Sequence, residues 1–260
     1  MASPRPQTIP VFLLVRTAYQ LLWQQRDDAL RLGLIPTLIC FGALAYGGDS
    51  LDFARMQFES GTTDQVPGDT FASLVVMLLI LLVGASLVIA NWLRFTLLGP
   101  MAAVGIGLNI GRTHVSFIIS CVLLGFGASI AGSVLSMPLM LLPGVLKAIG
   151  FVVILLVIMV VVARLLPFAV AQAIGQPMSL QQAWSASRGN GVALATAMIL
   201  VQVPMYIAAT LLTSILLTIG FASAAPLAMT FLEAVFQIID AVLIAIVLAT
   251  AFRQMVGIRV

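Results

Sequence analysis

The polar side chains with the greatest chemical potential lie inside an apolar segment near the end of the chain. The stretch FLEAVFQIIDAVLIAIVLATAFR, residues 231–253, is long enough to cross a membrane as a helix, yet it contains Glu233, Gln237 and Asp240. At about 100° per residue, these three fall within about 60° of one another on a helix. An ionisable side chain inside a bilayer is costly and usually faces protein or water. The spacing therefore predicts a shared polar pocket.

Gln202 is the expected partner of Asp240. It lies in the preceding apolar segment. If the two segments form an antiparallel hairpin, both side chains lie roughly 18 Å from the same membrane surface. We expect them to face each other or a common pocket. Two roles remain open for Asp240, namely a binding or proton-coupled site and a carboxyl group that only packs the bundle through a hydrogen bond to Gln202.

Four further residues are candidate charge partners of this polar face. Lys147 is predicted on the same outer side as Glu233, so an ion pair between them is one hypothesis, and contact of each with water is the other. Asn91 and Arg94 share a helix face near the inner end of their segment, and Arg164 lies near the inner end of another.

The sequence lacks the residue patterns of common catalytic and cofactor centres. The only histidine, His114, is interpreted as a solvated loop residue, and Cys40 and Cys121 as buried thiols. The glycines at 104, 106 and 111 follow no predicted strand and precede no P-loop lysine. We therefore predict no metal site, no cofactor, no catalytic residues and no nucleic-acid partner.

Composition places these residues in a membrane protein. Hydrophobic residues make up 62% of the 260 and charged residues 8%, whereas a soluble domain has about 25% charged residues. A bilayer core requires about 20 apolar residues per helix. We predict an all-α, polytopic membrane protein whose residues 1–260 form a single domain with six transmembrane helices in three hairpins, near 29–47, 70–93, 115–137, 146–165, 191–219 and 227–252.

Basic residues predict the orientation of these spans. With both termini in the cytoplasm, ten of the twelve basic residues face inward and only Arg55 and Lys147 face outward, as the positive-inside rule requires. Shorter stretches near 8–28, 99–114 and 179–190 precede the three hairpins, and we expect each to be a cytoplasmic amphipathic helix in the interface. Ser179 and Gln182 form a predicted capping box at the third.

One stretch carries a family resemblance. In RLLPFAVAQAIGQPMSLQQAWSASRGNGVALATAMIL, residues 164–200, an arginine and a proline end a span, and a short helix with the pattern S-x-x-x-A-W-x-x-S-R-G-N follows. This pattern resembles the membrane domain beside some bacterial glycerophosphodiester phosphodiesterases and related bacterial multi-pass proteins. The resemblance implies a six-helix protein of the bacterial inner membrane. It does not imply phosphodiesterase activity, because the soluble catalytic domain is missing from this sequence.

Three functions remain open on these grounds. The first is a non-catalytic inner-membrane protein that organises or assists membrane partners or lipids, with the bilayer and a membrane protein or a lipid ligand as partners. The second is a small transporter or permease subunit that uses Asp240. The third is a membrane-embedded lipid-modifying enzyme that uses Asp240 or Glu233.

Overall fold

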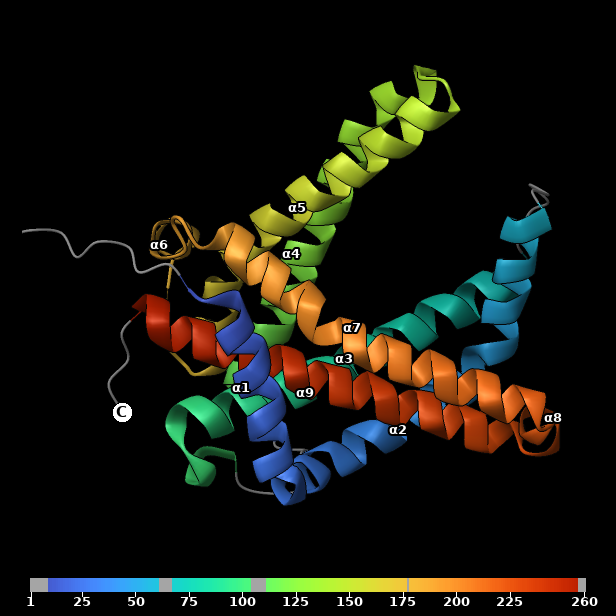
Figure 1. Ribbon diagram of the computed structural model, residues 1–260, viewed down its shortest axis with the longest axis horizontal. Helices are drawn as coiled ribbons and strands as arrows, with labels where there is room; N and C mark the ends of the chain where they lie inside the picture. The colour runs from blue at the N-terminus through green and yellow to red at the C-terminus, as the bar shows by residue number, and fades with distance from the viewer. Residues whose placement is uncertain (1–8, 61–66, 104–110, 177, 257–260) are drawn as a thin grey trace, which may run out of the picture.

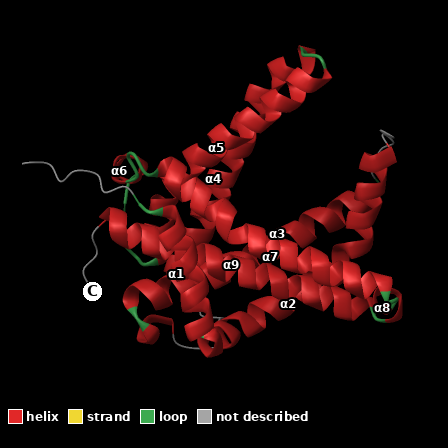
Figure 2. Ribbon diagram, in the orientation of Figure 1, coloured by secondary structure: helices red, strands yellow, loops and turns green. Residues whose placement is uncertain are grey.

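The computed structural model describes residues 9–60, 67–103, 111–176 and 178–256. Within these ranges the chain is helical and contains no strand (Figure 2). Six of the described helices are long and apolar enough to cross a membrane. The predicted all-α polytopic fold is therefore confirmed. These helices are α2 (Arg26–Ser60), α3 (Gly68–Leu98), α4 (Arg112–Ser136), α5 (Gly144–Ala173), α7 (Gly191–Thr218) and α9 (Pro226–Val256).

The six helices form three hairpins, α2–α3, α4–α5 and α7–α9, as predicted. The turns of the α4–α5 and α7–α9 hairpins, the end of α2 and the start of α3 all lie toward one end of the molecule (Figure 1). We call the opposite end the base. It holds α1 (Val11–Gln24), α6 (Leu180–Ala186) and the end of α9. From the base, the α4–α5 hairpin diverges from the other two (Figure 1).

Helix α9 is the centre of the bundle. It packs against α1, α2, α3 and α7. Of the residues in the most apolar 18-residue stretch of α9, 61% are buried inside the protein, compared with 0% in the corresponding stretch of α5. Its fully buried side chains include Leu243, Ala245 and Ile246. Small residues bring the neighbouring helices close together, and a Cβ atom on Gly84 of α3 would lie 2.8 Å from the Cys40 sulfur of α2. The polar residues of α9 therefore lie on the most buried of the six long helices.

Two helices extend beyond the predicted spans. The first span was predicted to end near 47, but α2 continues to Ser60. Residues 49–60 contain Leu, Ala, Arg, Met, Gln and Glu, which favour continuation of an existing helix. Helix α5 likewise continues past its predicted end near 165 to Ala173. Pro167 is buried inside this helix, where packing against neighbouring helices makes a proline tolerable.

The predicted amphipathic helices have different outcomes. The first is present as α1, with Arg16, Gln20 and Gln24 exposed. The third is present as α6, with the capping box between Ser179 and Gln182 formed in both directions. The second prediction, a helix near 99–114, is wrong where the structure describes it. Only a short 3₁₀ helix, η1 (Pro100–Ala103), is found there, 104–110 lie outside the described residues, and 112–114 are the first turn of α4.

Candidate functional site

Asp240 and Gln202 meet between α9 and α7. The Gln202 amide nitrogen donates a hydrogen bond of 3.3 Å to Oδ2 of Asp240, so the predicted pairing is present. Both side chains are half-buried. The second carboxyl oxygen, Oδ1 of Asp240, is buried and has no hydrogen-bond partner among the described residues. The carboxyl group is therefore only half satisfied, and buried polar atoms of this kind are costly.

Tyr19 of α1 is the third member of this cluster. Its hydroxyl group donates a hydrogen bond of 2.7 Å to the backbone carbonyl of Val201, next to Gln202. Burial raises the pKa of the Tyr19 phenol, and the nearby negative charge of Asp240 raises it further. Pro204, inside α7, lacks the N–H group that would bond the carbonyl of Leu200, one residue before the carbonyl that Tyr19 contacts. Tyr19 thus fixes α1 on the bundle.

The sequence analysis placed the helix near 8–28, which carries Tyr19, in the membrane interface and missed this contact. Two features together could have indicated it. Leu14 and Ala18 are fully buried on the same side of α1, and Pro204 weakens the hydrogen bonding of the turn of α7 that contains Leu200 and Val201.

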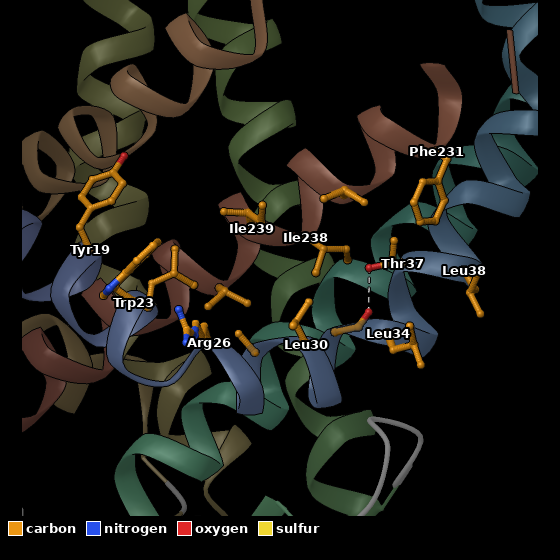
Figure 3. A pocket seen from close by; sticks show the side chains of 15 residues that line it. Tyr19, Trp23, Arg26, Leu30, Leu34, Thr37, Leu38, Phe231, Ile238 and Ile239 are labelled. Carbon is orange, nitrogen blue, oxygen red and sulfur yellow. Dashed lines mark hydrogen bonds between the residues drawn. The ribbon is translucent and has the colours of Figure 1, made fainter. Parts of the chain in front are cut away.

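A groove of about 440 Å³ opens beside this cluster, between α1, α2 and α9 (Figure 3). Tyr19, Trp23 and Arg26 line one end, and Leu38 and Phe231 line the other (Figure 3). The hydroxyl of Thr37 donates to the carbonyl of its own helix at Gly33, at 2.8 Å. The remaining lining side chains are apolar: Leu22, Ala29, Leu30, Leu34, Val235, Ile238, Ile239 and Val242.

The groove exists because small residues of α2 face α9. Gly33 and Ala29 lie in its wall, and a Cβ atom on Gly33 would lie 3.1 Å from a methyl carbon of Ile238. Trp23 and Leu30 remain 74% and 72% exposed, so the groove is open along its side. The arrangement suits an elongated apolar ligand with a polar end.

The other polar residues expected on α9 do not join the cluster. Glu233 and Gln237 are exposed. The ion pair of Glu233 with Lys147, one of the two hypotheses for these residues, is not found among the ion pairs of the described residues. Lys147 belongs to the first turns of α5, and that end of α5 diverges from the start of α9 (Figure 1). The polar face of α9 is therefore divided into an inner buried part and an outer exposed part.

His114 corrects the sequence interpretation. It is buried rather than solvated, at 3% exposure, because it lies in the first turn of α4 and not in a loop. Its Nδ1 accepts a hydrogen bond from the backbone N–H of Gly111, so Nε2 carries the proton and donates to Oδ1 of Asn91 at 2.9 Å. Asn91 is equally buried, at 3%. This pair joins α3 to α4.

Arg94 extends the same junction at the base. Its guanidinium donates to the hydroxyl of Thr113 at 3.2 Å and to the carbonyl of Ala173 at 3.1 Å, while Nε donates to the carbonyl of Ala102 at 3.3 Å. Ala173 ends α5, where a positive charge stabilises the helix dipole. Asn91 and Arg94 thus contact adjacent residues of α4, and their contacts join α3, α4 and α5.

Arg164 lies elsewhere, beside α6. Its guanidinium stacks on the Trp184 ring with 3.5 Å between the charged carbon and the ring centroid, and it donates to the Trp184 carbonyl at 3.0 Å. The carbonyl of Arg164 accepts a hydrogen bond from the Ser187 hydroxyl at 2.9 Å. Arg164 therefore belongs to a separate environment from Asp240.

Comparisons with protein-family models, with curated proteins and with solved structures found no match. The resemblance to the phosphodiesterase-associated membrane domain stays a prediction. Among the described residues, no cluster of three or more His, Cys, Asp or Glu side chains could hold a metal ion.

Proposed function

We propose that this protein is a non-catalytic membrane protein that holds a phospholipid in the groove between α1, α2 and α9. The single observation that supports this function is the shape and polarity of that groove. Its volume of about 440 Å³ lies within the range of ligand sites, about 300–1,000 Å³. Its lining contains no carboxylate, histidine or cysteine among the described residues, so it offers apolar contact rather than a reactive group.

The length of the groove fits one leaflet of a bilayer. From Arg26 to Leu38 its wall follows thirteen residues of α2, and the twelve steps between them rise about 18 Å at 1.5 Å per residue. Half of a hydrocarbon core of about 30 Å is about 15 Å. An acyl chain that follows the groove from its Trp23 end would therefore span one leaflet.

The polar end of the groove fits a phospholipid headgroup. Arg26 lies 5.6 Å from the centre of the Trp23 ring and 3.8 Å from a carboxyl oxygen of Asp27. Tryptophan and arginine favour the membrane interface. We place this end at the cytoplasmic face of a bacterial inner membrane, with both termini in the cytoplasm, on the strength of the basic residues that the base collects.

Thermal unfolding of the delipidated protein tests this function. Phospholipid at ten times its Kd should stabilise the folded state by about 1.4 kcal/mol, which is about 3–6 °C for a chain of this size. Ala29→Phe fills the groove and should abolish the shift. Ala208→Phe makes the same change on an exposed part of α7 and should keep it. Equal shifts in both variants would contradict the proposal.

A transporter is the second candidate, and the unpartnered Oδ1 of Asp240 favours it. A half-satisfied carboxylate in a span is costly and is often retained for proton or substrate binding. Proton-coupled uptake into proteoliposomes should then disappear in Asp240→Asn and persist in Glu233→Gln, whose carboxylate is exposed.

A further inference from the structure

Another cavity, of about 420 Å³, lies at the base between α5, α6 and the turn that leads into α7. We call it the arginine pocket. Its lining is polar and basic: Arg164, Gln181, Trp184, Ser185, Arg188 and Gly189. It shares no residue with the groove described above. We propose that the arginine pocket binds a phosphate group.

The geometry of Arg164 supports a bound anion. Stacking on Trp184 fixes the plane of the guanidinium group, and one of its N–H groups is used by the Trp184 carbonyl. Nε of Arg164 is buried and has no acceptor among the described residues. Guanidinium groups bind phosphate through two parallel hydrogen bonds when their plane is fixed. The guanidinium group of Arg164 is thus held in a fixed position and still has N–H groups that can donate hydrogen bonds to an anion.

The packing around Arg164 holds its stem. A Cβ atom on Gly191 would lie 2.4 Å from Cγ of Arg164, closer than real side chains approach, so only glycine allows the arginine to pass there. Ser187 is buried and holds the backbone of Arg164 through its carbonyl. The pocket is therefore a built feature of the α5–α6 junction.

The positive charge of the two arginines in the arginine pocket is not neutralised by carboxylates from the neighbouring part of the sequence. The sequence from Thr70 to Leu232 contains no aspartate and no glutamate, so Arg164 and Arg188 have no nearby carboxylate in sequence. No carboxylate lines the pocket in the described residues. Helix α7 begins at Gly191, directly after the pocket, and its positive dipole end adds to the same potential. An anion would supply the missing negative charge.

Phosphate is the anion class that this arrangement fits best. The guanidinium groups of two arginines can donate hydrogen bonds to several oxygens of one phosphate. Gln181 and Ser185 line the same pocket and provide uncharged hydrogen-bonding groups. The phosphate group could belong to a phospholipid headgroup or to a free phosphate, since the recognition chemistry is the same.

Binding measurements on the full chain in detergent test the proposal and separate the two sources. One arm titrates inorganic phosphate by calorimetry, and the other adds phosphatidylglycerol and counts bound lipid by native mass spectrometry. The test variant is Arg188→Gln, which changes an exposed side chain of the pocket. Its matched control is Arg112→Gln, an exposed arginine at the start of α4 that does not line the pocket.

The expected result is binding that is roughly three- to tenfold weaker in Arg188→Gln and unchanged in Arg112→Gln. A loss in the lipid arm identifies a headgroup, and a loss in the phosphate arm identifies a free anion. Ser185→Glu, which places a carboxylate in the pocket, should weaken binding in the same arm. If neither arm distinguishes the pocket variants from the wild type and from Arg112→Gln, the proposal is overturned.

Discussion

Replacement of Asp240 by asparagine should stabilise the folded protein. The asparagine oxygen can still accept the hydrogen bond from Gln202, whereas the charge disappears. A carboxylate at the centre of a span costs about 2.5–3.5 kcal/mol. The asparagine amide would occupy the place of the buried Oδ1, which has no partner in the described structure, and an unpaired amide costs about 1–2 kcal/mol. The difference between these two costs predicts a gain of roughly 0.5–2.5 kcal/mol in the free energy of unfolding.

Thermal unfolding monitored with a thiol-reactive dye measures this gain. Cys40 is buried in the folded bundle and becomes reactive on unfolding. A gain of about 0.5–2.5 kcal/mol corresponds to an increase in Tm of about 1–10 °C for a chain of this size. Glu233→Gln is the matched control, because the same charge is removed from an exposed position of the same helix, and its Tm should change little. An unchanged or lower Tm in Asp240→Asn would refute the view that Asp240 is a half-satisfied carboxylate.

Three other variants test the contacts at the base and around α1. Tyr19→Phe removes one hydrogen bond and should lower the free energy of unfolding by about 1 kcal/mol. Burial raises the folded-state pKa of Tyr19, so its contribution to stability is complete below the unfolded pKa of about 10 and is lost as pH rises through the folded-state pKa. Wild type should therefore lose more stability than Tyr19→Phe as pH rises above about 10. His114→Ala removes the hydrogen bond between His114 and the buried Asn91 amide, and it should lower the free energy of unfolding in denaturant by about 2–3 kcal/mol. A decrease below about 0.5 kcal/mol would contradict a structural role for this buried pair. Leu14→Glu puts a charge at a fully buried site and should prevent isolation of folded protein by size exclusion, whereas Phe12→Glu, at an 82% exposed position, should still yield it.

The spans and the hairpins could be predicted because they depend on local composition. Long apolar segments identify helices, and the Pro143-Gly144 pair, a typical turn signal, lies directly before α5 in the structure. The Gln202–Asp240 contact could also be predicted, because two helices joined by a short turn place residues at equal depth beside each other.

The remaining features depend on how the hairpins pack, which local patterns do not contain. The burial of His114 follows from the contact of α4 with Asn91 of α3. The separation of Lys147 from Glu233 follows from the divergence of the α4–α5 hairpin. The groove requires α1 to lie against α2 and α9, and the pattern of α1 alone equally predicts a helix that contacts only lipid.

Native mass spectrometry of the protein released from membranes tests the central claim most directly. Wild type and Ala208→Phe should each retain one more phospholipid than Ala29→Phe, because only the latter fills the groove between α1, α2 and α9. Identical lipid adducts in all three proteins would contradict the assignment of that groove as a phospholipid site.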